Sequence, residues 1–170
     1  MRTLATLSQM AVLRDLLPAY RIRLPTAQEK ATKVSKEIRA LRDYEALLLG
    51  HYQAFLKHCD ASCQTGSGRY AAPHERAYGG TAATCLGELL CAHPHFNFRA
   101  HVLKILAAKA GCAAKEMRGP CCTSLENLFD ADQQVWKVGG KRIGLQFVQV
   151  RLKSFFIPLN LKSFFLSIPS

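Results

Sequence analysis

Cysteine and histidine residues are the side chains in this sequence whose spacing comes closest to supporting chemistry. Structural zinc sites pair a Cys-x2–4-Cys unit with a second Cys or His unit, so that four ligands surround the metal. Cys59 and Cys63 have a compatible spacing, but Cys91, His93 and His95 follow one another too closely to form the second half. We therefore interpret the cysteines as small buried thiols and this second run as a His-Pro-His turn, and we expect no metal and no cofactor.

Catalytic chemistry has no recognisable motif in this chain. A cysteine hydrolase needs its nucleophile within reach of a general base and an oxyanion donor. The seven cysteines and six histidines fall into no such pattern, and the glycines form no phosphate-binding fingerprint. We expect no enzymatic activity and no small-molecule substrate. A small zinc-binding or thiol enzyme is the alternative of another class, and a stoichiometric metal in the purified protein would favour it.

Positive charge is the other chemical feature of the sequence. The net charge is +11 and the isoelectric point about 9.6, so an acidic partner such as nucleic acid is plausible. Residues 1–134 contribute +5 and residues 135–170 contribute +6. Five basic residues near the first proline-bounded segment could contact phosphates of rRNA: Arg21, Arg23, Lys36, Arg39 and Arg42. The alternative is a solvated helix face that Asp43 and Glu45 partly neutralise.

The hydrophobic pattern of residues 1–134 predicts helices joined by short linkers. Residues 3–17 predict a first helix, and residues 18–25 form a connector bounded by prolines. Thr26 and Glu29 form a capping box that opens a helix of about 34 residues, ~50 Å long, extending to Cys59. Its apolar stripe could pack in the core or bind a partner: Val34, Ile38, Leu41, Leu48, Tyr52 and Phe55.

Further along the chain, we expect an exposed loop over residues 63–80 and short helices over residues 81–92 and 99–110. Asn97 is a candidate N-cap for the second of these. Pro120 suits the first position of another helix. Short helices with brief linkers predict an all-α, HEAT-like helical-repeat (α-solenoid) fragment. After Gln134, glycines and a strand-like run over residues 143–152 predict an irregular, poorly structured tail.

Three runs of sequence resemble one known family. They are residues 12–56, which begin VLRDLLPAYRIRLPTAQEKATKVSKEIRALRDYE, residues 85–98, CLGELLCAHPHFNF, and the weaker residues 117–132, MRGPCCTSLENLFDAD. Together they resemble the nucleolar complex-associated protein 3 family over about residues 12–134. The second run contains the family's motif turn: Pro94, His95, Phe96, Asn97 and Phe98.

The resemblance implies a helical-repeat scaffold in the nucleus and nucleolus that takes part in assembly of the large ribosomal subunit. It implies binding to a nucleolar complex-associated sister protein and to pre-ribosomal particles, with contacts to rRNA or chromatin. In some organisms the family is implied to act on chromatin in DNA replication initiation, which is the runner-up function. Neither reading involves a membrane, and no stretch reaches the ~20 apolar residues of a membrane span.

Two departures from the family pattern affect this interpretation. Arg118-Gly119-Pro120 interrupts a run that the family would carry as a smoother helix. The resemblance stops near Gln134, where the family would continue through further helices. We therefore predict one domain over residues 1–134, and we interpret residues 135–170 as a truncation or gene-model artefact.

Overall fold

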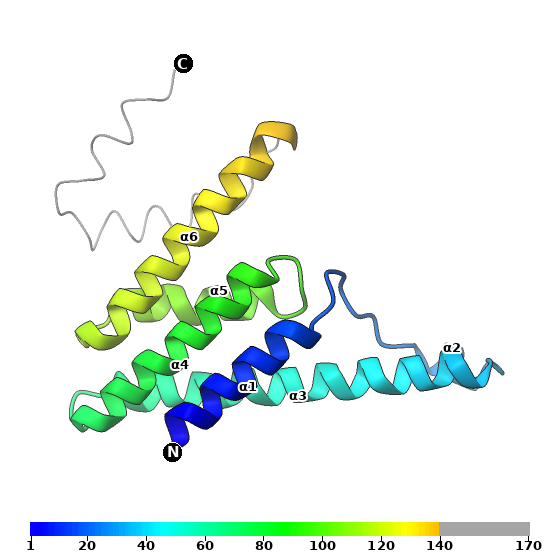
Figure 1. The fold of residues 1–170 in the computed structure, drawn as a ribbon, viewed down its shortest axis with the longest axis horizontal. Coiled ribbons are helices and arrows are strands. Elements are labelled where there is room, and N and C mark those ends of the chain that lie inside the picture. Colours follow the sequence, from blue (N-terminus) through cyan, green and yellow to red (C-terminus); the bar gives the residue numbers. More distant parts are fainter. Residues whose placement is uncertain (140–170) are drawn as a thin grey trace. The chain divides into compact units, whose positions relative to one another are not determined.

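The structure is a computed structural model that describes residues 1–139 of the chain. The described residues form helices and no strand, which confirms the all-α class. The helices are α1 (Arg2–Leu16), α2 (Ala27–Ala31), α3 (Lys36–Gly66), α4 (Pro73–Ala92), α5 (Arg99–Ala110) and α6 (Lys115–Gly139) (Figure 1). The chain divides into two units, Met1–Asp132 and Gln133–Ser170. Helix α6 runs across the expected boundary at Gln134, and the expected strand-like run lies outside the described residues.

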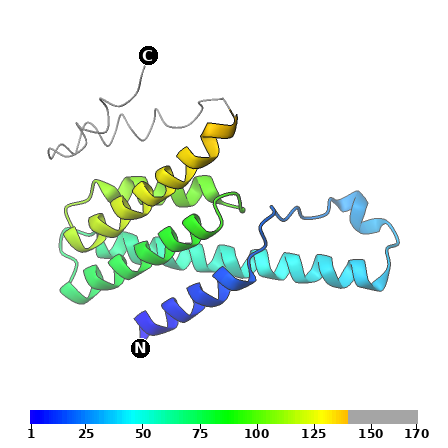
Figure 2. The ribbon, with the colours of Figure 1, turned by 45° about the horizontal axis from the view of Figure 1, so that its top comes forward.

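Two antiparallel helix pairs, α3 with α4 and α5 with α6, form the body of the first unit (Figures 1 and 2). Helix α1 lies against α4 and runs parallel to it, because Thr6 meets Tyr78 and the Arg14 carbonyl meets His93. Successive antiparallel helix pairs are the building principle of α-solenoids. The arrangement is therefore compatible with a HEAT-like fragment. None of the helices in residues 1–139 is long and apolar enough to span a membrane.

Leucines and thiols from α3 to α6 fill the core. Apolar side chains that lose contact with water stabilise the fold in proportion to the buried area. The largest fully buried side chains are Leu56, Leu86, Leu89, Val102, Leu106, Met117, Leu125 and Leu128, together with Cys59, Cys63, Cys85 and Cys121. The interpretation of these four cysteines as small buried thiols therefore agrees with the structure.

Glycines let α4 approach its neighbours closely. A Cβ at Gly79 would lie 2.6 Å from Met117 Cε of α6, and a Cβ at Gly87 would overlap Ser124 Oγ. The expectation of an exposed loop over residues 63–80 holds only for residues 67–72, and it is wrong for the residues on either side, which are helical. Helix α3 continues to Gly66, and α4 begins at Pro73, with Glu75 Oε2 accepting the Ala72 N–H at 2.8 Å. Small residues that suggest a loop in the sequence are helical residues at a close helix contact.

The expectation of one helix from Thr26 to Cys59 is also wrong. Helix α2 is a short segment, and the chain leaves helical geometry at Thr32, whose ψ is 132°. Helix α3 then begins with its own cap, in which Ser35 Oγ accepts the Ile38 N–H at 3.3 Å. A second N-cap allows the chain to reverse between the two helices, so α2 lies beside α3 rather than continuing it.

Pro120 occupies a different position from the one expected. It lies inside α6, five residues after the helix begins at Lys115, rather than at its first position. Proline has no N–H, so the Glu116 carbonyl lacks its usual partner four residues on. That carbonyl faces Gly80 of α4, where a Cβ would lie only 2.6 Å away. The Arg118-Gly119-Pro120 run is thus accommodated within a helix.

Candidate functional site

The candidate site is an arm formed by residues 18–47, which comprise the connector, α2, the link to α3 and the first turns of α3. Figures 1 and 2 show the N-terminal part of α3 extending beyond α1, α4 and α5, with only the connector and α2 beside it. The apolar stripe expected from the sequence is divided at this point. Leu48, Tyr52 and Phe55 are buried in the body. Ile38 and Leu41 are exposed on the arm, and Val34 is half-buried in the link before α3.

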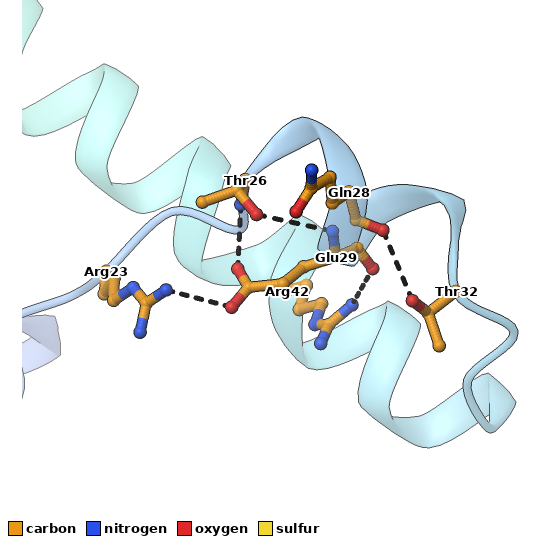
Figure 3. Close-up of polar contacts among 6 residues, drawn as sticks. All are labelled: Arg23, Thr26, Gln28, Glu29, Thr32 and Arg42. Atoms are coloured by element: carbon orange, nitrogen blue, oxygen red, sulfur yellow. Dashed lines mark hydrogen bonds and ion pairs between the residues drawn. The ribbon is translucent and has the colours of Figure 1, made fainter.

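Glu29 holds α2 in place through several polar contacts (Figure 3). Its carboxylate accepts the Thr26 N–H at 2.8 Å and pairs with Arg23 Nη2 at 2.9 Å. The Thr26 hydroxyl accepts the Glu29 N–H at 3.3 Å and completes the capping box expected from the sequence. The bond from the Thr26 amide, assisted by the charge of Arg23, lowers the pKa of Glu29.

Helix α3 provides two attachments for this segment. Arg42 Nη1 donates to the Glu29 carbonyl at 3.2 Å, which ties the C-terminal half of α2 to α3. The Tyr20 hydroxyl donates to Glu45 Oε1 at 2.7 Å, and this hydrogen bond raises the pKa of Tyr20. Glu45 breaks the apolar stripe in the sequence because it is the anchor for the connector. Glu45 stands between Leu41 and Leu48, where the spacing of the stripe would place an apolar residue. The spacing therefore marks this residue but not its partner.

The motif turn at Pro94–Phe98 fixes the connector to the body. The Asn97 side chain accepts the Ile22 N–H and donates to the Ile22 carbonyl, both at 2.9 Å. Ile22 itself is buried, with 4% of its surface exposed. The expectation that Asn97 caps α5 is wrong, because Phe98 holds the N-cap position with a left-handed φ of 65°. That backbone reversal leaves the Asn97 amide facing the connector.

Aromatic rings and a histidine extend this clamp on both sides. Tyr52 of α3 meets Phe96 edge to face, with ring centroids 5.3 Å apart, and Phe98 at 6.2 Å. His93 Nε2 donates to the Arg14 carbonyl at 2.8 Å and satisfies an orphan acceptor near the end of α1. Pro94 is half-buried and His95 is exposed in the same turn. Together, His93 and the motif turn therefore join α1, the connector and α3.

The five basic residues expected at a phosphate or partner surface fall into two groups. Arg23 and Arg42 make the internal contacts that hold α2. Arg21, Lys36 and Arg39 are exposed, and each lacks an ion pair or side-chain hydrogen bond with another described residue. The structure thus leaves three of the five cations available to solvent or to a partner.

The cysteine and histidine residues of the zinc hypothesis do not converge. Cys63 donates to the Gly79 carbonyl at 3.6 Å, whereas Cys91 donates to the Ser124 carbonyl at 3.6 Å. Burial raises the pKa of the Cys63 thiol to about 12, which disfavours the thiolate that metals bind. Over residues 1–139, no three Cys, His, Asp or Glu side chains form a group that could hold a metal ion.

These features define an all-helical protein whose candidate site is an interaction surface on a projecting arm. A sequence model of the family described as nucleolar complex-associated protein matches residues 1–55, which contain α1 and the arm. The chain is 34% identical over 139 residues to the nucleolar complex protein 3 homolog of Danio rerio. It is 36% identical over 126 residues to nucleolar complex-associated protein 3 of Arabidopsis thaliana. The chain belongs to the nucleolar complex-associated protein 3 family.

The similarity covers most of this chain but a small part of its relatives. The zebrafish match covers 78% of this chain and 17% of the relative, and the Arabidopsis match covers 74% and 14%. A protein of the same name from Saccharomyces cerevisiae is 35% identical over 73% of this chain and 18% of its own length. The chain therefore spans less than a fifth of the length of these relatives.

Proposed function

We propose that this chain is a non-enzymatic helical scaffold of the nucleolus that acts in ribosome biogenesis. Within ribosome biogenesis, we propose that it acts in the assembly of large-subunit precursors and in the processing of rRNA. Family membership carries the proposal, because the relatives are named for a nucleolar complex. The match of the family model to residues 1–55 supports a central role for the arm.

In this proposal the arm is the part that joins the complex. The body of α3 to α6 supplies a rigid base, and the clamp around Asn97 sets the direction in which the connector leaves it. The arm itself exposes apolar side chains beside the exposed cations Arg21, Lys36 and Arg39. Such a surface suits a sister protein of the nucleolar complex and, through it, pre-ribosomal particles. Residues 1–134 would be the functional domain, with residues 135–170 outside it.

The test is localisation and sedimentation of the tagged full chain in eukaryotic cells. We expect nucleolar accumulation and co-sedimentation with large-subunit precursors on a density gradient. A Leu48→Asp chain is the control, because Leu48 is buried and an unpaired buried carboxylate disrupts the fold. A folded wild-type chain that stays diffuse, or that gathers on chromatin, and that sediments only as free protein would overturn the proposal.

Treatment of the lysate with RNase separates two modes of association. If protein contacts hold the chain in the complex, it should remain bound to protein partners after RNase treatment. If direct rRNA contacts dominate, it should be released, and its association should weaken steeply with salt. We expect retention, because Arg23 and Arg42, two of the five candidate basic residues, are already used inside the arm.

A further inference from the structure

An apolar ridge of partly exposed side chains runs along α3 in the arm. It consists of Ile38, Leu41, Tyr44 and Leu47, which follow one another at a spacing of three residues on α3. Their exposed fractions are 47%, 55%, 50% and 64%. A row of side chains spaced by three is one of the ridges that helices use when they pack into the groove of another helix. From Ile38 to Leu47 the ridge is about 14 Å long at 1.5 Å per residue.

The residues one helical turn after Ile38 and Leu41 already contact the rest of the arm. Arg42 contacts the Glu29 carbonyl of α2, and Glu45 contacts Tyr20 of the connector. The capping box and the Arg23–Glu29 pair hold α2 in a defined conformation. The arm is therefore a preorganised pair of segments, with α2 and the connector on the flank of the ridge next to Ile38 and Leu41. This order reduces the cost of binding a partner.

Charge on the arm selects the kind of partner. Residues 18–47 carry four acids, Glu29, Glu37, Asp43 and Glu45, against the seven basic residues Arg21, Arg23, Lys30, Lys33, Lys36, Arg39 and Arg42. The arm thus has a net charge of +3, more than half of the +5 of residues 1–134. The N-terminus of α3 at the tip of the arm adds partial positive charge. An acidic partner complements this field.

We propose that the ridge docks an acidic amphipathic helix of about three turns from a partner protein. This inference rests on the proposed scaffold function and specifies the chemistry of the partner at the arm. A protein helix is favoured over RNA, because the ridge is aliphatic at three of its four positions and two of the arm's arginines serve internal contacts. Sequence-tolerant RNA surfaces instead combine free cations with aromatic stacking platforms.

The test uses the full chain and three synthetic 16-residue helical peptides with one leucine stripe. Their polar faces carry Glu, Gln or Lys, and binding is measured by fluorescence anisotropy at low salt. We expect the Glu peptide to bind at least tenfold more tightly than the Lys peptide. The variant Leu41→Ser/Tyr44→Ser should lose at least tenfold in affinity for the Glu peptide. Leu4→Ser on α1 is the matched control, because Leu4 is also exposed, at 71%, but lies outside the arm.

A second variant tests the charge argument without touching the ridge. Lys36→Glu/Arg39→Glu should weaken binding of the Glu peptide and strengthen binding of the Lys peptide. The melting temperature should stay unchanged, because both side chains are exposed. Equal binding of the three peptides would overturn the inference, as would a folded ridge variant with wild-type affinity. The inference would also be overturned, in favour of RNA, if a short rRNA oligonucleotide displaces the peptide from the wild type and does not bind the ridge variant.

These results are separable from the failure of the scaffold proposal. If the ridge variant still accumulates in nucleoli and co-sediments with large-subunit precursors, the docking site is wrong while the scaffold function stands. If the wild-type chain itself does not co-sediment, the scaffold function fails whatever the peptides show.

Discussion

Replacing Asn97 with alanine should release the connector from the body while leaving the helices folded. The Asn97 side chain makes both hydrogen bonds that hold the backbone of Ile22, each at 2.9 Å. Alanine makes neither bond, and the N–H and C=O of a residue with only 4% of its surface exposed then lose their partners. The backbone must either stay buried and unsatisfied or move into water.

The expected cost follows from these two bonds. A typical intramolecular hydrogen bond contributes about 1 kcal/mol net, so the pair contributes about 2 kcal/mol. Burying both groups unsatisfied would cost more, roughly 1–3 kcal/mol for each group. Local release of the connector is the cheaper response. We therefore expect the free energy of opening the connector to fall by about 2 kcal/mol, which corresponds to roughly a 30-fold larger open population.

Limited trypsin digestion measures this opening directly. Arg21 and Arg23 flank Ile22 and are exposed, so cleavage after either requires only that the connector backbone leave the body. When opening is fast relative to cleavage, the cleavage rate follows the open population. Asn97→Ala should therefore be cut at these sites about 30-fold faster than the wild type. Mass spectrometry of early fragments identifies the bonds that are cut.

Gln53→Ala is the matched control, because it removes an exposed amide on α3 that makes no side-chain hydrogen bond with another described residue. Its cleavage rate should match that of the wild type. Asn97→Asp should resemble Asn97→Ala at neutral pH, because a carboxylate accepts from the Ile22 N–H but cannot donate to the Ile22 carbonyl. If Asn97→Ala is cleaved at the wild-type rate, the clamp does not hold the connector and the reasoning is refuted.

Three further predictions concern the body of the protein. Gly87→Ala should lower the free energy of unfolding by roughly 1–3 kcal/mol in urea, because its Cβ would overlap Ser124 Oγ; Gly50→Ala, with open space around it, should be neutral or stabilising by up to about 1 kcal/mol. Leu48→Asp should abolish cooperative melting, and a wild-type melting curve would contradict the core position of Leu48, which is 7% exposed. Burial raises the pKa of the thiols of Cys63 and Cys121 from 9.0 to about 12, so they stabilise the fold fully below about pH 9 and lose this contribution as pH rises toward 12. The melting temperature should fall across that range, and less so in Cys63→Ala/Cys121→Ala.

Several elements could be predicted from the sequence because their signals are local. The capping box of Thr26 and Glu29 needs only residues three apart, and the structure contains it. The helices over residues 3–17 and 99–110 follow from apolar spacing and nearby stop signals, and they correspond to α1 and α5. The end of α1 before Pro18 follows from the steric effect of proline on the preceding residue.

Other features were missed because their causes lie far away in the sequence. Gly79 and Gly80 suggested a loop, but their lack of side chains allows Met117 and Glu116 of α6 to approach α4 closely. Glu45 stood out in an apolar stripe, but only the position of Tyr20 explains it. Arg42 ties α2 beside α3 through the Glu29 carbonyl, and no periodicity in the sequence reveals that contact.

By itself, the sequence determined the all-helical class and the membership in a family, because helix periodicity and short motifs depend only on residues that are close together in the sequence. It also determined that residues 18–47 carry +3 of the charge of residues 1–134, although only the structure shows that they form an arm. Only the tertiary structure decided which part of the long stripe is core and which is surface. Leu48 and Leu41 are both leucines on one helix, but Leu48 is 7% exposed and Leu41 is 55% exposed. The N-terminal part of α3 extends beyond the other helices of the body (Figure 1). Burial is a property of neighbours, and distant parts of the chain supply those neighbours.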